Sequence, residues 1–273
     1  MTTIIIPTAK YIPEDLQKIG KIPPILYPLE GRMVLDHILN NYGENDHVRL
    51  LCYEGVEIVR SRLKFNDERK IEIIEIEQLK SLGQTVLEGL DGISGPVVIN
   101  FGDTIVGESM KHIQEDSFYY SEEYHSKRWT FFEIKDSVLE IIDRPPDSNV
   151  IGNAFVGVFC FSDSVIFKKC LRKYEDRDDM FYSAIAEYYL KYKLKPIKTD
   201  KWFDIGHPDR YIDSKRRVQA RIFNHISVDK NRGMLTKHSD NHQKLIGEIR
   251  WYMKIPTDIE YCRPRIFSYS FST

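Results

Sequence analysis

Short apolar runs rich in β-branched residues alternate with amphipathic segments in the N-terminal part of the chain. A continuous apolar run such as Thr3–Pro7 is typical of a strand that is buried on both faces. Apolar residues three and four positions apart, as in Met33–Asn41, indicate a helix. The pattern predicts strands at Thr3–Pro7, His47–Tyr53, Lys70–Ile76 and Pro96–Phe101, and helices at Met33–Asn41, Val56–Leu63 and Leu82–Leu90. Strands that alternate with helices predict an α/β fold with a mostly parallel mixed sheet flanked by helices.

The pattern becomes less regular beyond this region. Two apolar runs flank the polar turn Lys135–Ser137, which predicts a hairpin. The further predicted elements are strands at Trp129–Ile134, Val138–Ile142 and Asn153–Phe161, a helix at Phe181–Lys191, and then a hairpin of Phe223–Val228 with Arg232–Lys237, a helix at His242–Met253 and a last strand at Arg265–Ser270. We therefore expect a large domain at residues 1–221 and a small α+β appendage at residues 222–273.

The composition of the 273 residues is ordinary for a globular protein, with 42% hydrophobic and 29% charged residues. A net charge of −2 provides no basic field that would attract nucleic acid. No run reaches the ~18 apolar residues that a membrane-spanning helix needs, and the N-terminus lacks the features of a signal peptide. The cysteines are far apart and form no Cys-x-x-Cys pair, which is typical of reduced thiols and predicts a cytoplasmic protein.

Asp103 is the first candidate for chemistry, because it follows the predicted strand Pro96–Phe101 and a glycine. In open α/β sheets, ligands collect at the carboxyl ends of the parallel strands. A carboxylate at that edge is well placed to bind Mg²⁺, which takes one or two carboxylates together with substrate phosphates. The competing interpretation is an ordinary turn, since Gly-Asp is a common loop pair.

Asp204 lies in a similar setting, after aromatic residues and before Gly206 and Pro208. As a single occurrence it could also cap a helix that starts near Pro208. If Asp103 and Asp204 converge, they form the pair of carboxylates that commonly holds Mg²⁺ against a triphosphate for in-line attack at phosphorus.

Several short segments, taken in order, resemble the sugar-phosphate nucleotidyltransferase family. They are Ile4–Ala9, Pro23–Gly31, Leu82–Thr85, Phe101–Asp103, Asp143–Pro145, Asn153–Gly157 and Trp202–Gly206. The resemblance spans roughly Thr3 to Val218. It implies a Rossmann fold of the glycosyltransferase-A type and a Mg²⁺-dependent transfer of a nucleotide.

The resemblance also implies a role for particular residues. It implies nucleotide binding by Pro7, Thr8, Ala9, Leu82, Gly83, Gln84, Thr85 and Gly102, acceptor binding by Asn153, Gly157 and Trp202, and metal binding by Asp103 and Asp204. Cations that face the phosphates would be Lys10, Lys21 and Arg144. The aromatic run that includes Tyr124 and Trp129 could line an acceptor pocket, although packing in the core or the hairpin is the more common use of such residues.

The phosphate loop departs from the family pattern. The family's loop is rich in glycine and carries an arginine, because backbone N–H groups must approach the phosphates and a cation must neutralise them. Here no glycine occurs between Thr8 and Gly20, and Pro24 stands where a lysine follows the proline. Lys10, Lys18 or Lys21 could supply the missing charge.

We expect an enzyme that joins an NTP, with CTP or UTP favoured, to a phosphorylated sugar or alcohol and releases pyrophosphate. Such a product would serve the synthesis of a surface polysaccharide or capsule, and the enzyme could be a homo-oligomer. The altered loop leaves open a second hypothesis, a catalytically degenerate regulatory subunit. An NDP-sugar glycosyltransferase is less favoured, because Gly102–Thr104 offers one carboxylate where those enzymes have Asp-x-Asp.

The C-terminal part has a resemblance of its own. Met234–Lys237, Lys244–Glu248 and Pro264–Tyr269 resemble the start of the N-lobe in the choline-kinase and aminoglycoside-phosphotransferase family. The resemblance implies that Lys237 pairs with Glu248 to hold ATP phosphates. The sequence has no room for the catalytic loop of such kinases after these segments, so we expect a truncated lobe without kinase activity. An ordinary hairpin and helix is the alternative.

Overall fold

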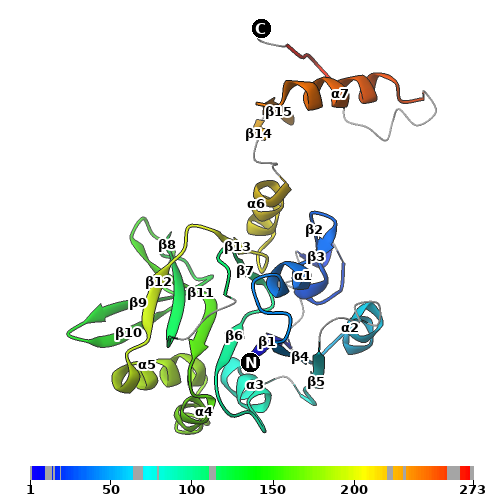
Figure 1. Ribbon diagram of the computed structural model, residues 1–273. Helices are drawn as coiled ribbons and strands as arrows, with labels where there is room; N and C mark the ends of the chain where they lie inside the picture. The colour runs from blue at the N-terminus through cyan, green and yellow to red at the C-terminus, as the bar shows by residue number, and fades with distance from the viewer. Residues whose placement is uncertain are drawn as a thin grey trace. The chain divides into compact units, whose positions relative to one another are not determined.

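Parallel strands form one half of the main sheet in the computed structural model (Figure 1). They lie in the order β5, β4, β1, β6, and each neighbouring pair is parallel. Their bounds are Thr3–Thr8 for β1, His47–Cys52 for β4, Ile71–Glu75 for β5 and Val97–Asn100 for β6. The strands predicted at these places are confirmed. The central ones, β1 and β6, are buried almost throughout, as expected where a strand is covered on both faces.

Helices connect successive parallel strands, as the alternating pattern predicts. α1 (Val34–Leu39) follows β1, α2 (Val56–Leu63) follows β4, and α3 (Leu82–Gly89) follows β5. The chain moves outward from β1 through β4 to β5 and then returns, so that β6 pairs with the other side of β1. In open α/β sheets such a reversal of strand order opens a crevice at the carboxyl ends of the strands. The ends of β1 and β6 therefore mark the place where a ligand is expected.

The other half of the main sheet is mostly antiparallel. β11 (Ile151–Phe161) pairs with β6 and continues the sheet to β8 (Ser117–Tyr124) and β9 (Thr130–Lys135). β9 and β10 (Val138–Asp143) form the predicted hairpin, and β12 (Lys195–Lys198) runs parallel to β8. The sheet is thus mixed, which confirms the predicted α/β class.

The main core lies between this sheet and a layer of helices. α4 (Ser164–Arg172) and α5 (Met180–Tyr192) contact each other and α3 along one face of the sheet (Figure 1). Aromatic rings interlock there; Phe159, for example, meets Phe181 edge to face at 5.1 Å between ring centroids. Burying each such ring contributes about 2 kcal/mol. α5 confirms the predicted helix, whereas α4 was not predicted.

Small elements complete the large unit near the carboxyl ends of the parallel strands. β7 (Thr104–Val106) and β13 (Trp202–Asp204) form a separate two-stranded sheet. The loop after β1 contains η1 (Leu16–Lys18), η2 (Pro24–Leu26), β2 (Pro28–Leu29) and β3 (Arg32–Met33). α6 (Pro208–Gln219) begins just after β13, and its Tyr211 hydroxyl donates to the carbonyl of Pro28 at 2.6 Å. This bond ties the start of α6 to the loop.

The structure describes residues 2–270 except 10–13, 15, 19, 64–69, 79, 111–114, 220–223, 230–231 and 257–264. The chain divides into the units Met1–Ser214 and Lys215–Thr273, so the border falls within α6 and a few residues before the expected border at 221. Within the described ranges, no helix is long and apolar enough to span a membrane.

The smaller unit contains a hairpin and a helix. β14 (Asn224–Asp229) pairs with β15 (Met234–Ser239), and α7 (His242–Met253) matches the predicted helix. Lys237 forms an ion pair with Glu248, the two residues that the kinase resemblance links. The strand predicted at Arg265–Ser270 is wrong: these residues form no strand in the described structure. An alternating apolar pattern does not make a strand unless a neighbouring strand accepts its hydrogen bonds.

Candidate active site

The carboxyl ends of β1 and β6 meet at a tight turn that carries Asp103. The N–H of Gly102 donates to the carbonyl of Pro7 at 3.2 Å, so the turn lies against the end of β1. The buried Asn100 amide holds the turn from below, because it donates to the carbonyls of Phe101 (2.8 Å) and Thr104 (3.0 Å). Asn100 was not among the predicted residues, yet a buried amide within an apolar strand is a signal that could have identified it.

β7 and β13 bring Asp103 and Asp204 together. The two strands pair antiparallel with Thr104 opposite Asp204, and the N–H of Ile205 donates to the carbonyl of Asp103 at 2.8 Å. The two aspartates therefore occupy neighbouring positions on adjacent strands, although they lie far apart in the sequence. They do so at the switch point of the main sheet, where β1 and β6 end.

Gly206 lies beside the carboxylates of both aspartates. An ideal Cβ on Gly206 would lie 2.7 Å from Oδ2 of Asp103 and 3.3 Å from Oδ1 of Asp204. Both carboxylates thus lie beside Gly206. A methyl group there would overlap with Asp103, so the arrangement requires glycine at this position.

The electrostatics of Asp103 reflect this proximity. Burial and, as a smaller cause, the nearby charge of Asp204 raise the pKa of the Asp103 carboxyl to about 6, while His207 opposes the shift. Two carboxylates in a poorly solvated site repel each other unless a cation or a proton neutralises them. The pair is therefore suited to a divalent cation.

Asp204 is almost fully buried, with 6% of its surface exposed, and its oxygens are held unequally. Oδ1 accepts from the N–H of Gly206 at 2.8 Å. Oδ2 accepts from the indole N–H of Trp129 at 3.2 Å and contacts Nδ1 of His207 at 3.0 Å. Because an ionised carboxylate only accepts hydrogen bonds, Nδ1 of His207 is the donor. The sequence predicted neither the Trp129 contact nor the His207 contact.

The residues present fit Mg²⁺ better than a metal that needs a full protein cage. Within the described residues, no group of three or more His, Cys, Asp or Glu side chains could hold a metal ion. Mg²⁺ requires less, because it commonly takes one or two carboxylates and completes its shell with substrate phosphates and water. Asp103 and Asp204 meet that requirement.

Arg144 and Asp103 both lie close enough to Tyr182 for their charges to act on it. Burial raises the pKa of Tyr182 to about 12, and the charges of Asp143, Arg144 and Asp103 all act on its hydroxyl. Arg144 itself is exposed and has a left-handed backbone with φ of 43°, directly before Pro145. Such a conformation is unfavourable for arginine and persists only where the surroundings enforce it.

The predicted phosphate loop is only partly described. Lys10 lies outside the described residues, and Lys21 is exposed in the segment that leads to η2. Thr8 lies against Gly102, and its buried hydroxyl has no hydrogen-bond partner among the described residues. Ala9 is buried in the core.

The segment Leu82–Thr85 forms the first turn of α3. The Gln84 side chain accepts from the N–H of Ser81, completing a capping box, and its amide reaches the carbonyl of Glu175 at 3.4 Å. Gly83 lies against Met180, where a Cβ would approach to 2.6 Å, and Thr85 is buried. These side chains support the helix start, so contact with a base at this place would come mainly from the backbone.

The predicted acceptor residues lie in different surroundings. Gly157 forms an irregularity in β11 with φ of 90°, and its carbonyl accepts from the N–H of Phe101, next to the turn of Asp103. Asn153 lies further along β11, opposite Glu122 and Phe132. Trp202 is 7% exposed and packs edge to face on Trp129 at 5.3 Å between ring centroids. Gly157 and Trp202 are thus linked to the segment that carries Asp103, since Trp202 pairs with Val106 of β7.

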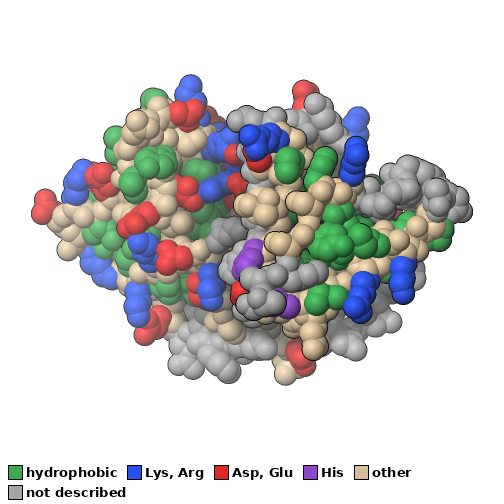
Figure 2. All heavy atoms as spheres, turned by 90° about the horizontal axis from the view of Figure 1, so that it is seen from above, with side chains coloured by type: hydrophobic (Ala, Val, Ile, Leu, Met, Phe, Trp, Pro, Cys, Tyr) green, Lys and Arg blue, Asp and Glu red, His purple; other side chains and the backbone are tan. Residues whose placement is uncertain are grey.

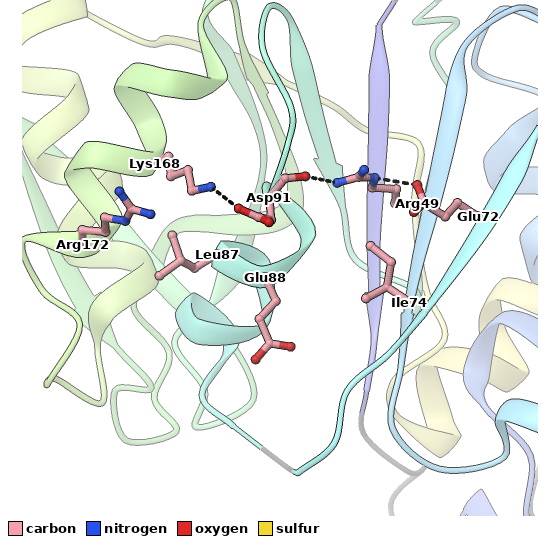
Figure 3. Close-up of a pocket in the computed structure, with 8 residues that line it drawn as sticks. All are labelled: Arg49, Glu72, Ile74, Leu87, Glu88, Asp91, Lys168 and Arg172. Carbon is pink, nitrogen blue, oxygen red and sulfur yellow. Dashed lines mark hydrogen bonds and ion pairs between the residues drawn. The ribbon is translucent and has the colours of Figure 1, made fainter.

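The large unit has several surface cavities, two of which are similar in size. One, of about 530 Å³, includes Trp129 and Arg210 in its wall and so borders the side chains around Asp204. The other, of about 560 Å³, contains none of the predicted site residues (Figure 3). Its charged residues are largely satisfied within the protein, because Arg49 bonds to Glu72 and to the carbonyl of Asp91, and Lys168 pairs with the Asp91 side chain. Figure 2 shows basic and acidic side chains interspersed over much of one face of the molecule.

A reversed strand order is typical of open α/β folds that bind ligands at the carboxyl ends of their strands. Solved structures identify the fold more closely. A putative glucose-1-phosphate thymidylyltransferase from Bacillus anthracis matches with a TM-score of 0.67 and 16% identity, covering 82% of this chain and 98% of that one. A UTP-bound UGPase from Acinetobacter baumannii matches with a TM-score of 0.59 and 12% identity, covering 80% and 93%. The chain therefore has the fold of sugar-phosphate nucleotidyltransferases.

The sequence comparisons are more distant. No protein-family profile matches the chain. The bifunctional protein GlmU of Methanococcus maripaludis (strain C5) is 23% identical over 212 residues, which is 75% of this chain. The chain spans about half the length of that relative, 51%. None of the three proteins named above is a kinase, so the kinase resemblance of the smaller unit stays a prediction.

Proposed function

We propose that the chain is a nucleotidyltransferase that joins an NTP to a phosphorylated sugar or alcohol and releases pyrophosphate. The observation that carries the proposal is that Asp103 and Asp204 lie side by side, against Gly206, at the switch point of the sheet. The fold supports it, because the two solved structures described above carry the names of enzymes with this type of chemistry.

In the proposed reaction, a phosphate oxygen of the acceptor attacks the α-phosphorus of the NTP. A new P–O bond forms, the bond from the α-phosphorus to the bridging oxygen breaks, and pyrophosphate leaves with that electron pair. The acceptor is already an anion, so the protein needs neither a nucleophile nor a general base. The residues have to align the two phosphates and neutralise their charge.

Asp103 and Asp204 are the residues that would hold Mg²⁺. When bound, the ion neutralises charge on the triphosphate and on the developing pyrophosphate. The raised pKa of Asp103, about 6, supports this role, because a cation relieves the repulsion that raises it. Arg144 is the best-supported cation for the acceptor phosphate, since it is exposed and its charge, like that of Asp103, acts on Tyr182.

The remaining parts of the proposal concern the substrates. UTP or CTP is the preferred nucleotide, and the UTP-bound neighbour supports a pyrimidine nucleotide. The product would be an activated precursor for a surface polysaccharide or capsule. A cytoplasmic location suits an enzyme that uses NTPs, and Cys52, Cys160 and Cys170 are buried free thiols, as expected in a reducing compartment.

The test is a pyrophosphate-release screen of four NTPs against a panel of phosphorylated sugars and alcohols, with Mg²⁺. We expect release with at least one pair and a loss of about a thousandfold or more in Asp103→Asn, because the developing charge loses its counter-ion. Asp136→Asn, in the exposed turn between β9 and β10, is the matched control and retains wild-type turnover.

Other outcomes would point to the alternatives. Mg²⁺-dependent stabilisation by nucleotides without pyrophosphate release from any pair would indicate a catalytically inactive subunit. Transfer of sugar from an NDP-sugar, with release of NDP and no use of NTP, would indicate a glycosyltransferase. Equal turnover of wild type and Asp103→Asn would refute the proposed site.

A further inference from the structure

Trp129 connects two parts of the large unit that are distant in sequence. It lies just before β9, in the antiparallel half of the main sheet, and its indole N–H donates to Oδ2 of Asp204 at the end of β13. The ring is itself held firmly. It meets Trp202 edge to face at 5.3 Å and His207 at 5.9 Å, both measured between ring centroids.

Arg210 fixes the same ring from another direction. Its guanidinium carbon lies 4.7 Å from the centre of the Trp129 ring and 5.5 Å from that of Trp202. The guanidinium also forms an ion pair with Glu123, at the end of β8. Cation–π contact and ion pair together restrain Arg210 and, through it, the indole.

The two carboxylate oxygens of Asp204 differ in the number of hydrogen bonds that they accept. Oδ2 is occupied by two donors, Trp129 and His207, and has little capacity left. Oδ1 has one protein donor, the N–H of Gly206, and keeps a free acceptor position. Oδ1 is also the oxygen that lies, with Oδ2 of Asp103, beside Gly206.

We propose that Trp129 is a positioning residue, which together with His207 makes Asp204 bind the metal ion through Oδ1 alone. This inference rests on the metal site of the proposed function, and it adds a reason for the choice of metal. A carboxylate limited to one oxygen suits the small octahedral shell of Mg²⁺, whereas Ca²⁺ readily takes carboxylates through both oxygens. Trp129 and His207 would thus bias the site toward Mg²⁺.

The role of Trp129 is tested with Trp129→Phe, which keeps an aromatic ring and removes the N–H donor. Mn²⁺ bound to the nucleotide-free protein serves as the probe, detected by electron paramagnetic resonance, and is displaced by Mg²⁺ or by Ca²⁺. Outer hydrogen-bond partners of metal ligands typically contribute about tenfold or more to metal affinity. We therefore expect Mg²⁺ to bind about tenfold more weakly, and Ca²⁺ to bind as well as in wild type or better.

Three further variants make the result specific. Trp251→Phe removes an exposed indole on α7 and should leave both affinities unchanged. His207→Phe should shift the preference in the same direction as Trp129→Phe, because both act on Oδ2. Asp204→Asn should abolish the Mn²⁺ signal, which identifies the site that is being measured.

Two results would overturn the inference. An unchanged ratio of Mg²⁺ to Ca²⁺ affinity in Trp129→Phe would show that the indole does not select the oxygen, even if both affinities fall because packing is lost. The inference would also fail if the wild-type protein bound no Mn²⁺, or if its Mn²⁺ signal were the same in Asp204→Asn, because Trp129 would then have no metal ligand to position. Neither readout depends on turnover, so a failure of the pyrophosphate screen with normal ion selection would refute the proposed function and leave this inference standing.

Discussion

The backbone N–H of Ile205 donates a 2.8 Å hydrogen bond to the carbonyl of Asp103. This bond continues the pairing of β7 with β13 beyond the pair Thr104–Asp204. The distance between the two carboxylates is therefore set by backbone hydrogen bonds and not by long side chains. Substitutions of the carboxylates should change the chemistry of the site and leave the surrounding sheet intact.

Asp103→Asn is expected to stabilise the protein in the absence of divalent cations. Burial and the charge of Asp204 raise the pKa of Asp103 to about 6 from the ordinary 3.8, so its ionised form is unfavourable in the folded state. The wild type therefore loses stability as the pH rises from about 4 through 6. At pH 7.5 the variant should gain about 2 kcal/mol in the free energy of unfolding, measured with urea.

The pH dependence of this gain in stability provides an internal control. At pH 3.5 the carboxyl is protonated in both folded and unfolded chains, so the gain should be nearly absent there. Asp136→Asn should show no difference between the two pH values. A gain for Asp103→Asn that is equal at both pH values would contradict the electrostatic explanation.

Metal binding should follow the same titration in the opposite direction. A cation needs the ionised carboxylate, so protons compete with it below the pKa of Asp103. The affinity for Mn²⁺ is expected to rise about fivefold between pH 5 and 6 and to level off above pH 7. Titration calorimetry at several pH values measures this, and an affinity that does not change over that range would argue against Asp103 as a ligand.

Gly206→Ala should block the metal site without unfolding the protein. The Cβ of the alanine would lie 2.7 Å from Oδ2 of Asp103. The Asp103 carboxylate would therefore have to turn away from residue 206. We expect turnover in the pyrophosphate assay to fall about a hundredfold, because small displacements of positioning groups are costly. Gly247→Ala on α7 is the control: its Cβ meets no atom within 4 Å, and it should stabilise the helix by roughly 1 kcal/mol without a change in turnover.

Much of the fold could be predicted from the sequence, because burial imposes a period on the chain. The all-apolar run of β1 and the helical spacing of α7 both lead to the observed elements. α4 was missed although Asp163 accepts from the N–H groups of Val165 and Ile166 as an N-cap, a signal that the sequence does contain.

The site was less accessible to prediction than the fold. Asp103 and Asp204 could be found because each follows a strand and precedes a glycine or lies close to one. β7 and β13 are three residues each, too short for a periodic pattern, so the pairing of Thr104 with Asp204 depends on tertiary structure. The bond from Trp129 to Asp204 likewise joins residues whose sequence positions carry no sign of contact.

The left-handed backbone of Arg144 leads to a prediction that separates stability from activity. Its φ of 43°, directly before Pro145, is unfavourable for arginine and acceptable for glycine. Arg144→Gly should therefore raise the free energy of unfolding by about 1 kcal/mol. If the guanidinium binds the acceptor phosphate, the same change should raise KM for the acceptor about tenfold or more and leave KM for the NTP nearly unchanged. Lys193→Gly is the matched control, because Lys193 also has a left-handed backbone (φ 55°) at the end of α5. This variant should gain similar stability, with both KM values unchanged. Equal KM effects in the two variants would show that Arg144 acts only through the backbone.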